Sequence, residues 1–178
     1  TLYDEFVTKF KAAMAAVAPT DPSTKGTRLG PLSSAAAAEH LSRQVEQAVK
    51  EGAELSGGER QGNFFSTGVL TNVKPDNIAY REELFGPVAS VFKASSEDEA
   101  IRLSKDTEFG LGAYVFTTDA AQAERVANAL ETGMVFVNLV GADSPELPFG
   151  GVKKSGFGRE LGHLGASEFV NKKMIRTA

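Results

Sequence analysis

A glycine-rich stretch near the end of the chain, PFGGVKKSGFGRELG, covers residues 148–162 and carries five glycines, two lysines and an arginine. Such stretches often bind phosphate, because glycine lets backbone N–H groups approach an anion. A P-loop needs glycine directly before the lysine that precedes Ser or Thr, but Lys153 stands before Lys154. A dinucleotide fingerprint that starts at Gly156 reaches Leu161 where its third glycine belongs. The residues therefore favour a loop that turns several times, and they argue against a phosphate site.

Other side chains capable of chemistry are few. The chain contains no cysteine, which excludes disulfides, thiolate zinc sites and a cysteine nucleophile. Its two histidines, His40 and His163, are too few for a metal cluster, so we predict no metal site and only solvated or capping roles for them. Neither histidine stands in a recognisable arrangement with Ser144 or Ser155, so no serine nucleophile is predicted.

Length and composition set the broad class. The 178 residues suggest one domain, and 42% hydrophobic with 24% charged residues is typical of a globular protein. A net charge of −4 gives no basic field for nucleic acid or acidic membranes. The N-terminus does not resemble a secretion signal and no apolar run reaches membrane-spanning length, so we expect a cytoplasmic protein.

The first half of the chain reads as helices followed by a strand. Apolar residues at helical spacing predict a helix over residues 2–18, and a loop rich in Pro, Gly, Ser and Thr follows over residues 19–32. A second helix is capped by Ser33 or Ser34 and ends at Gly52. Its predicted inner stripe is Ala38, Leu41, Val45 and Ala48. Residues 64–73 read as a strand.

The second half alternates strands and helices. Strands are expected over residues 88–94, 113–117 and 134–139. A capping box at Ser96 and Glu99 opens one intervening helix, and Asp119 caps the other. Near-continuous apolar strands separated by helices predict an α/β fold with three layers, a mostly parallel sheet and helices on both faces. The β-prone tail, residues 168–178, has no local strand to pair with.

Two motifs resemble segments of the NAD(P)-dependent aldehyde dehydrogenases. EELFGPV at residues 82–88 is similar to a segment of that family, and residues 148–162 are similar to a second one. Shorter matches lie in family order at residues 3–7, 30–31, 109–110 and 137–138. The resemblance covers nearly the whole chain and is nearest in kind to bacterial succinate-semialdehyde dehydrogenases. It implies a catalytic-domain portion over residues 1–167 and an oligomerisation strand over residues 168–178.

The resemblance implies roles for three residues. Glu83 would bind the hydroxyls of the nicotinamide ribose, since a carboxylate can accept from two neighbouring hydroxyls. Phe85 would contact that ribose and the nicotinamide ring, and Phe149 would line the path of the aldehyde substrate. Without the resemblance, Glu83 would read as an exposed acid, and Phe85 and Phe149 as core aromatics. The polar residues Lys153, Ser155, Arg159 and Glu160 are interpreted as structural.

The family's own chemistry implies what this chain lacks. A cysteine thiolate attacks the aldehyde, a glutamate acts as base, and an asparagine with a backbone N–H stabilises the oxyanion. In family order these groups lie upstream of Tyr3, so no catalytic residue is assigned here. We therefore expect the C-terminal portion of a longer enzyme, inactive alone. NAD or NADP would be bound mainly by an N-terminal domain, which leaves the choice between them open.

Substrate and partners follow from the same resemblance. Residues 139–147 would help shape specificity, and Ser144 could meet a substrate carboxylate, although Asp143 and Glu146 argue against a strongly anionic pocket. Succinate semialdehyde is the expected aldehyde, and the full-length protein is expected to be a homodimer or homotetramer. Two alternatives stay open: a naturally short, non-catalytic assembly module of an aldehyde dehydrogenase, or an unrelated α/β binding domain.

Overall fold

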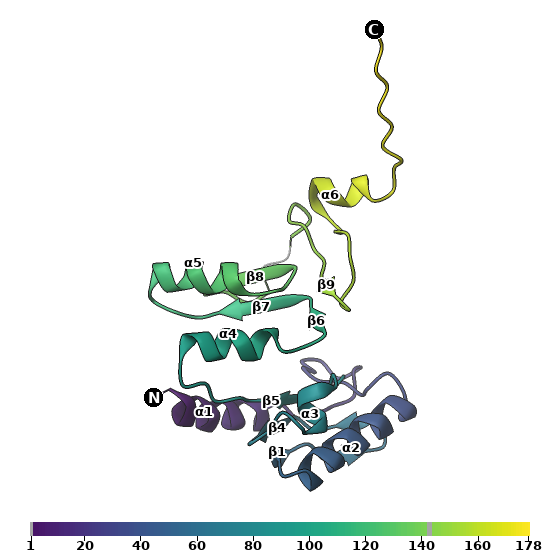
Figure 1. The fold of residues 1–178 in the computed structure, drawn as a ribbon. Coiled ribbons are helices and arrows are strands. Elements are labelled where there is room, and N and C mark those ends of the chain that lie inside the picture. Colours follow the sequence, from purple (N-terminus) through teal and green to yellow (C-terminus); the bar gives the residue numbers. More distant parts are fainter. Residues whose placement is uncertain (1, 142–143) are drawn as a thin grey trace. The chain divides into compact units, whose positions relative to one another are not determined.

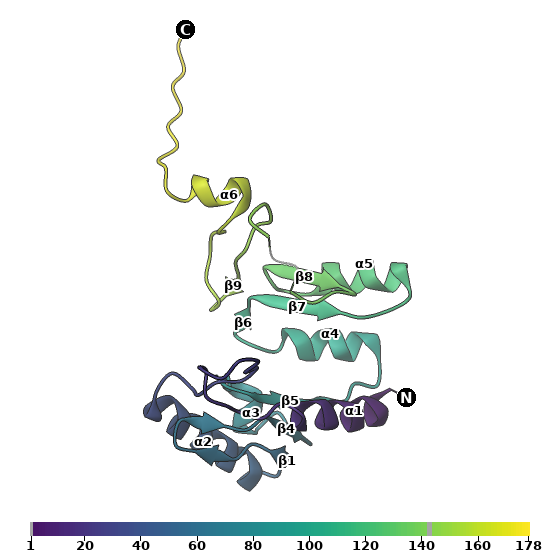
Figure 2. The same cartoon turned by 180° about the vertical axis from the view of Figure 1, so that it is seen from behind.

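The structure is a computed structural model that describes residues 2–141 and 144–178. It divides into two compact units, the first ending at Lys93 and the second beginning at Ala94 (Figures 1 and 2). None of the helices among these residues is long and apolar enough to cross a membrane.

The first unit combines helices with a small mixed sheet. Its elements are α1 (Tyr3–Ala15), α2 (Ala35–Lys50), β1 (Glu54–Gly57), β2 (Arg60–Gln61), β3 (Phe64–Phe65), β4 (Gly68–Thr71), α3 (Ile78–Arg81) and β5 (Val88–Ser90). Strand β4 is the centre of the sheet, antiparallel to β1 and parallel to β5. The short strands β2 and β3 form a separate antiparallel hairpin.

Helix α2 forms and buries its predicted face. Ser34 caps it, since its hydroxyl accepts a hydrogen bond from the N–H of Ala37 at 3.1 Å. Gly52 follows its end in a left-handed conformation. The predicted stripe is confirmed: its four residues, Ala38, Leu41, Val45 and Ala48, are all buried. Leu41, Val45 and Ala48 belong to one buried cluster with Phe65, Leu70 and Val88. The helix therefore forms one side of the first unit's core.

The strand predicted over residues 64–73 is wrong as a single element. The structure has β3 and β4 there, separated at Ser66 and Thr67. Ser66 donates its N–H to the carbonyl of Glu59 and accepts the N–H of Glu59 on its hydroxyl, 2.8 Å each. The Thr67 hydroxyl donates to the carbonyl of Met14 in α1 at 2.7 Å. Polar side chains thus divert the backbone from one continuous ladder to local partners.

The second unit contains a strand–helix–strand repeat. Its elements are α4 (Glu97–Lys105), β6 (Phe109–Gly110), β7 (Gly112–Val115), α5 (Ala120–Ala129), β8 (Met134–Val137), β9 (Val152–Lys153) and α6 (Gly162–Ser167). Strands β7 and β8 are parallel, and α5 packs on both of them (Figure 2). Strands β6 and β9 pair antiparallel and tie the glycine-rich stretch to this unit.

Capping in the second unit follows the sequence. The N–H of Glu99 donates to the Ser96 hydroxyl at 3.2 Å, and the Glu99 carboxylate accepts from the N–H of Ser95 at 2.7 Å. Asp119 accepts from the N–H groups of Ala121 and Gln122 at 2.9 and 3.2 Å. Both predicted N-caps are therefore confirmed.

An ion pair joins α4 to α5. Arg125 binds Glu97 in a bidentate manner, with Nε···Oε1 at 2.6 Å and Nη2···Oε2 at 2.9 Å. Gln122 adds a third donor, Nε2···Oε2 at 2.9 Å. The Arg125 guanidinium lowers the pKa of Glu97 to about 2, with help from the Gln122 amide. The carboxylate therefore remains charged, and the pair intact, across the whole neutral range.

The α/β class is confirmed, and its finer description is not. Among the described strands, β1, β4 and β5 form one mixed sheet and β7–β8 is a separate parallel pair, whereas β2–β3 and β6–β9 are antiparallel pairs. Residues 168–178 form no strand; they continue beyond α6 and are exposed throughout (Figure 1). A β-strand needs a neighbouring edge for its hydrogen bonds, and within the described residues this tail pairs with no strand. Its pairing stays a prediction.

Candidate functional site

The turn between α3 and β5, residues 82–87, presents two of the predicted site residues. Leu84 packs inward against the core, whereas Glu83 is exposed and Phe85 is 78% exposed. Hydrogen bonds from the Gly86 N–H to the Leu84 carbonyl and from the Val88 N–H to the Gly86 carbonyl, 2.8 Å each, fold the turn tightly. The alternation places a carboxylate and an aromatic ring, two residues apart in sequence, on an open surface.

The exposed ring of Phe85 contradicts the alternative interpretation of this residue as a core aromatic, and its predicted contact with the cofactor stays a prediction. A phenylalanine this open to solvent is costly unless something covers it. The Glu83 carboxylate accepts no hydrogen bond from any residue that the structure describes. Both groups are therefore available to a ligand.

The turn rests on helix α2. Gln44, which is 3% exposed, donates from Nε2 to Glu82 Oε2 at 2.9 Å and to the backbone carbonyl of Glu83 at 3.2 Å. One helical turn earlier, Leu41 contacts Gly86 so closely that a Cβ on Gly86 would lie 2.4 Å from Leu41 Cδ2. Gln44 was not predicted as a site residue from the sequence. The signal available was an amide placed directly before Val45 on the buried face of an otherwise apolar stripe.

Phe149 belongs to the second unit. It is half-buried, and its backbone exchanges two hydrogen bonds with Glu160, at 2.8 and 2.7 Å. Together with Leu147 and Pro148 it lines an apolar hollow of about 270 Å³ against residues 133–136. This position at the wall of an apolar hollow is compatible with both a core contact and contact with a substrate.

Charged side chains of the glycine-rich stretch bind groups of the chain itself. Arg159 Nη1 donates to the carbonyls of Gly151 and Gly158 at 2.9 and 2.6 Å. Lys153 Nζ donates to the carbonyls of Lys105 and Thr107, at 3.0 and 3.2 Å, at the C-terminal end of α4.

Ser155, Lys154 and Lys153 have further partners outside the stretch. The Ser155 hydroxyl accepts the N–H of Gly110 at 3.0 Å, and Lys154 pairs with Glu108. Glu131 forms an ion pair with Lys153 at 3.0 Å. Hydrogen bonds from Lys105 and, to a smaller extent, from Lys153 lower the pKa of Glu131. These cations are bound to carbonyls and carboxylates of the chain, and the absence of a phosphate site stays a prediction.

Ser144 is engaged before any substrate arrives. Its hydroxyl donates to Glu146 Oε2 at 2.6 Å and lowers the pKa of that carboxyl. In this conformation Ser144 has no proton to offer a substrate carboxylate. Asp143, the third residue considered for specificity, lies outside the described residues. His40 and His163 are exposed, and the described residues contain no group of three or more metal-ligating side chains.

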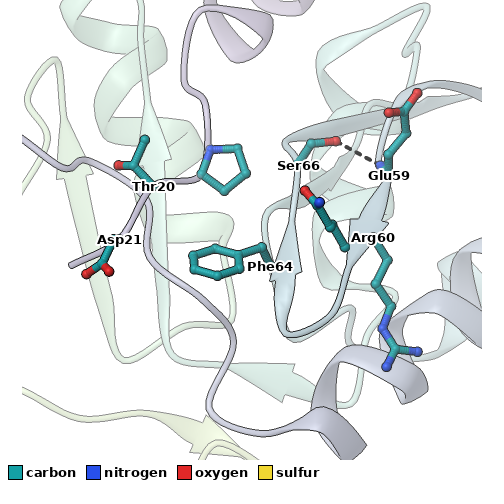
Figure 3. A pocket seen from close by; sticks show the side chains of 8 residues that line it. Thr20, Asp21, Glu59, Arg60, Phe64 and Ser66 are labelled. Atoms are coloured by element: carbon teal, nitrogen blue, oxygen red, sulfur yellow. Dashed lines mark hydrogen bonds between the residues drawn. The ribbon is translucent and has the colours of Figure 1, made fainter. Parts of the chain in front are cut away.

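A second hollow lies in the first unit between the loop at Pro19–Asp21 and the β2–β3 hairpin (Figure 3). It measures about 520 Å³, and the ring of Phe64 points into it. Its polar groups bond within the chain: Asp21 accepts from Ser23, and the Ser66 hydroxyl accepts from Glu59. These bonds make the hollow a poorer candidate than the Glu83 turn.

Comparison with known proteins decides the family. The sequence matches the aldehyde dehydrogenase family over residues 1–175, nearly the full chain. The chain belongs to the aldehyde dehydrogenase family. Both motifs that carried the resemblance, residues 82–88 and 148–162, fall inside the matched range.

Relatives of this aldehyde dehydrogenase chain include succinate-semialdehyde dehydrogenases. The NADP(+) enzyme of Deinococcus radiodurans is 50% identical over 98% of this chain and 38% of its own length. The NAD(P)+ enzyme Sad of Escherichia coli is 46% identical over 93% of this chain and 37% of its own length. The chain thus spans about two fifths of the curated relatives it matches.

Solved structures agree with the sequence comparison. Gox0499, whose structure concerns cofactor and substrate selection, superimposes with a TM-score of 0.93 at 46% identity and covers 99% of this chain and 40% of that one. Succinic semialdehyde dehydrogenase from Streptococcus pyogenes, in complex with NADP+, gives 0.89 at 40% identity, over 98% of this chain and 40% of that one. The aldehyde dehydrogenase fold of this region is therefore shown.

Proposed function

We propose that this chain forms part of a longer aldehyde dehydrogenase that oxidises succinate semialdehyde to a dicarboxylic acid with NADP+. The observation that carries the proposal is 50% identity, over 98% of the chain, to an NADP(+)-dependent succinate-semialdehyde dehydrogenase. An open carboxylate and an open aromatic ring on the Glu83–Phe85 turn support it. The nucleophilic cysteine is supplied by sequence outside this chain, which contains none.

The role of the turn is to hold the nicotinamide end of the cofactor. When bound, the nicotinamide accepts a hydride from the substrate. The Glu83 carboxylate has two acceptor oxygens and can receive both ribose hydroxyls. Phe85 then gains cover for its exposed ring by lying against the ribose and nicotinamide, which restricts how that ring can tilt.

Phe149 is proposed to guide the aldehyde. Its backbone is held by the paired bonds to Glu160, and its side chain lines the hollow that would receive the apolar part of a substrate. Ser144 is proposed as no more than a secondary contact, since its proton is held by Glu146 at 2.6 Å.

Replacement of Glu83 tests the function directly. In a full-length dehydrogenase carrying this sequence, Glu83→Gln keeps one acceptor and loses the charge-assisted bonds, a loss of about 1–3 kcal/mol. We expect the dissociation constant of NADP+ to rise about 5-fold to 150-fold, with the KM for succinate semialdehyde within about twofold of the parent. Fluorescence titration and steady-state kinetics measure the two constants.

Glu46→Gln is the matched control, because it removes the same charge from the exposed side of α2. It should leave both constants unchanged. Unaltered cofactor affinity together with an unaltered hydride-transfer rate in Glu83→Gln would refute the proposed role. A full-length parent that oxidises no aldehyde with NADP+ or NAD+ would refute the function itself.

The tail, residues 168–178, is proposed to be a separate C-terminal segment that forms the oligomerisation strand. Phe169, Met174 and Ile175 are 91%, 83% and 77% exposed, an unfavourable state for large apolar side chains in water. An edge strand of another subunit would supply the backbone partners that the tail lacks.

Deletion of residues 168–178 from the full-length dehydrogenase should reduce its oligomeric state, from dimer or tetramer to smaller species. The physical reason is the loss of both the backbone ladder and the apolar side chains that it would bury. Size-exclusion chromatography with light scattering measures the mass. A truncated protein with the parent's mass would show that the tail is dispensable for assembly.

A further inference from the structure

We propose that Gln44 is a positioning residue of this dehydrogenase, whose buried amide holds the main chain of Glu83 so that the Glu83 carboxylate faces the nicotinamide ribose. The inference rests on the proposed function of Glu83. Gln44 itself touches neither cofactor nor substrate, because it lies beneath the turn and is 3% exposed.

Both hydrogen bonds that the Gln44 amide donates go to the turn. Nε2 carries two hydrogens, and it donates at 2.9 Å to Glu82 Oε2 and at 3.2 Å to the Glu83 carbonyl. These partners lie 38 and 39 residues further along the chain. One side chain of α2 therefore fixes both the residue before the cofactor-binding carboxylate and the backbone from which that carboxylate projects.

The orientation of the amide is determined by its partners. Turning it over would place Oε1 against the Glu82 carboxylate and the Glu83 carbonyl, which are both acceptors. In the present orientation Oε1 is buried and accepts no hydrogen bond from the residues that the structure describes. Burial of an unsatisfied acceptor is unfavourable.

Packing alone does not account for this side chain. The buried face of α2 is otherwise apolar, with Leu41, Val45 and Ala48 around Gln44. A methionine or leucine would fill the same space without an orphan acceptor. The glutamine is thus explained by what its two N–H groups hold.

Other contacts anchor the turn without fixing Glu83. Leu84 packs inward, Gly86 lies on Leu41, and the N–H of Glu82 donates to the Ile78 carbonyl at 2.9 Å. These place the turn on the unit as a whole. The peptide that follows Glu83 can still rotate about its flanking bonds unless its carbonyl is held, and that carbonyl is the one that Gln44 binds.

The experiment compares two ligands in the full-length dehydrogenase carrying Gln44→Met. NADP+ needs the nicotinamide ribose site, whereas adenosine 2′,5′-bisphosphate lacks that ribose. We expect the dissociation constant of NADP+ to rise about 3-fold to 10-fold and that of the bisphosphate to stay within about 1.5-fold. Hydride transfer should slow, while Tm stays equal or rises because the orphan acceptor is gone.

Gln47→Met is the matched control, because it makes the same substitution on the exposed side of α2. There the Gln47 amide binds only Glu51, at 2.7 Å, among the described residues. It should alter neither constant. A structural role of Gln44 would instead lower Tm and weaken both ligands together, and that result overturns the proposal, as does unchanged NADP+ affinity.

One outcome separates this inference from the function on which it rests, and a second variant covers a failure to fold. If the parent binds NADP+ and Glu83→Gln weakens it while Gln44→Met does not, the positioning role alone fails. If Gln44→Met does not fold, Glu82→Ala on the exposed surface takes its place. That variant removes the hydrogen bond from Gln44 to the Glu82 carboxylate and leaves the one to the Glu83 carbonyl. It should raise the dissociation constant of NADP+ about twofold and leave that of the bisphosphate unchanged. No change in NADP+ affinity would overturn the proposal.

Discussion

The 178-residue chain alone, incubated with succinate semialdehyde and NADP+, is expected to form no NADPH. It contains no cysteine, so no thiolate can form a covalent intermediate with the aldehyde. Serine is no substitute here, because the Ser144 hydroxyl donates to Glu146 and the Ser155 hydroxyl accepts the N–H of Gly110. Absorbance at the wavelength of reduced nicotinamide measures the outcome.

Cofactor affinity of the isolated chain should be weak as well. In their proposed roles Glu83 and Phe85 meet only the nicotinamide end, so the free energy of binding the pyrophosphate and adenine would be missing. A full-length dehydrogenase carrying the same residues is the positive control. Turnover by the purified chain, after removal of any contaminating full-length enzyme, would contradict the assignment of catalysis to sequence outside it.

The same preparation tests the alternative of an assembly module. A short chain that serves assembly should co-purify with a separately expressed full-length dehydrogenase and change its mass or activity. A chain that is one part of a single enzyme should remain apart from the completed oligomer.

Gly133→Ala is expected to destabilise the second unit by about 3 kcal/mol or more. A Cβ at this position would lie 1.9 Å from the carbonyl oxygen of Gly150 and 2.9 Å from Gly151 Cα. These are backbone atoms of the loop that Arg159 holds through Gly151, so they cannot move aside cheaply. Gly133 has no left-handed φ, which makes space the whole reason for glycine here.

Gly112→Ala provides the comparison on the neighbouring strand. Its Cβ would meet first the end of the Met134 side chain, at 3.6 Å, which is an ordinary contact. Urea unfolding should give a much lower midpoint for Gly133→Ala and a nearly parental one for Gly112→Ala. Equal midpoints for the two variants would mean that the Gly150 loop yields without cost.

Local features were predictable from the sequence because they depend on residues a few positions apart. The caps at Ser34, Ser96 and Asp119 and the buried face of α2 all follow from such spacing. Features that depend on distant partners were not. The break between β3 and β4 depends on Ser66 reaching Glu59 and Thr67 reaching Met14, and no pattern in the sequence marks these bonds.

The candidate site shows the same division. Glu83 and Phe85 were identified through a motif, since an exposed acid followed two residues later by a phenylalanine has no chemical signature of its own. That Phe85 is exposed and that Gln44 supports Glu83 are consequences of tertiary structure, set by residues nearly forty positions apart. Propensity and periodicity carry no information over that distance.

The orphan acceptor of Gln44 has a consequence for directed evolution. A library screened for heat resistance alone would favour apolar residues at position 44, because they remove an unsatisfied buried group. With Gln44 in its proposed positioning role, the selected variants would lose nicotinamide affinity while gaining melting temperature. Position 44 is thus a point at which selection for robustness and selection for turnover oppose each other, and a consensus or stability-guided redesign of this enzyme should hold the glutamine fixed.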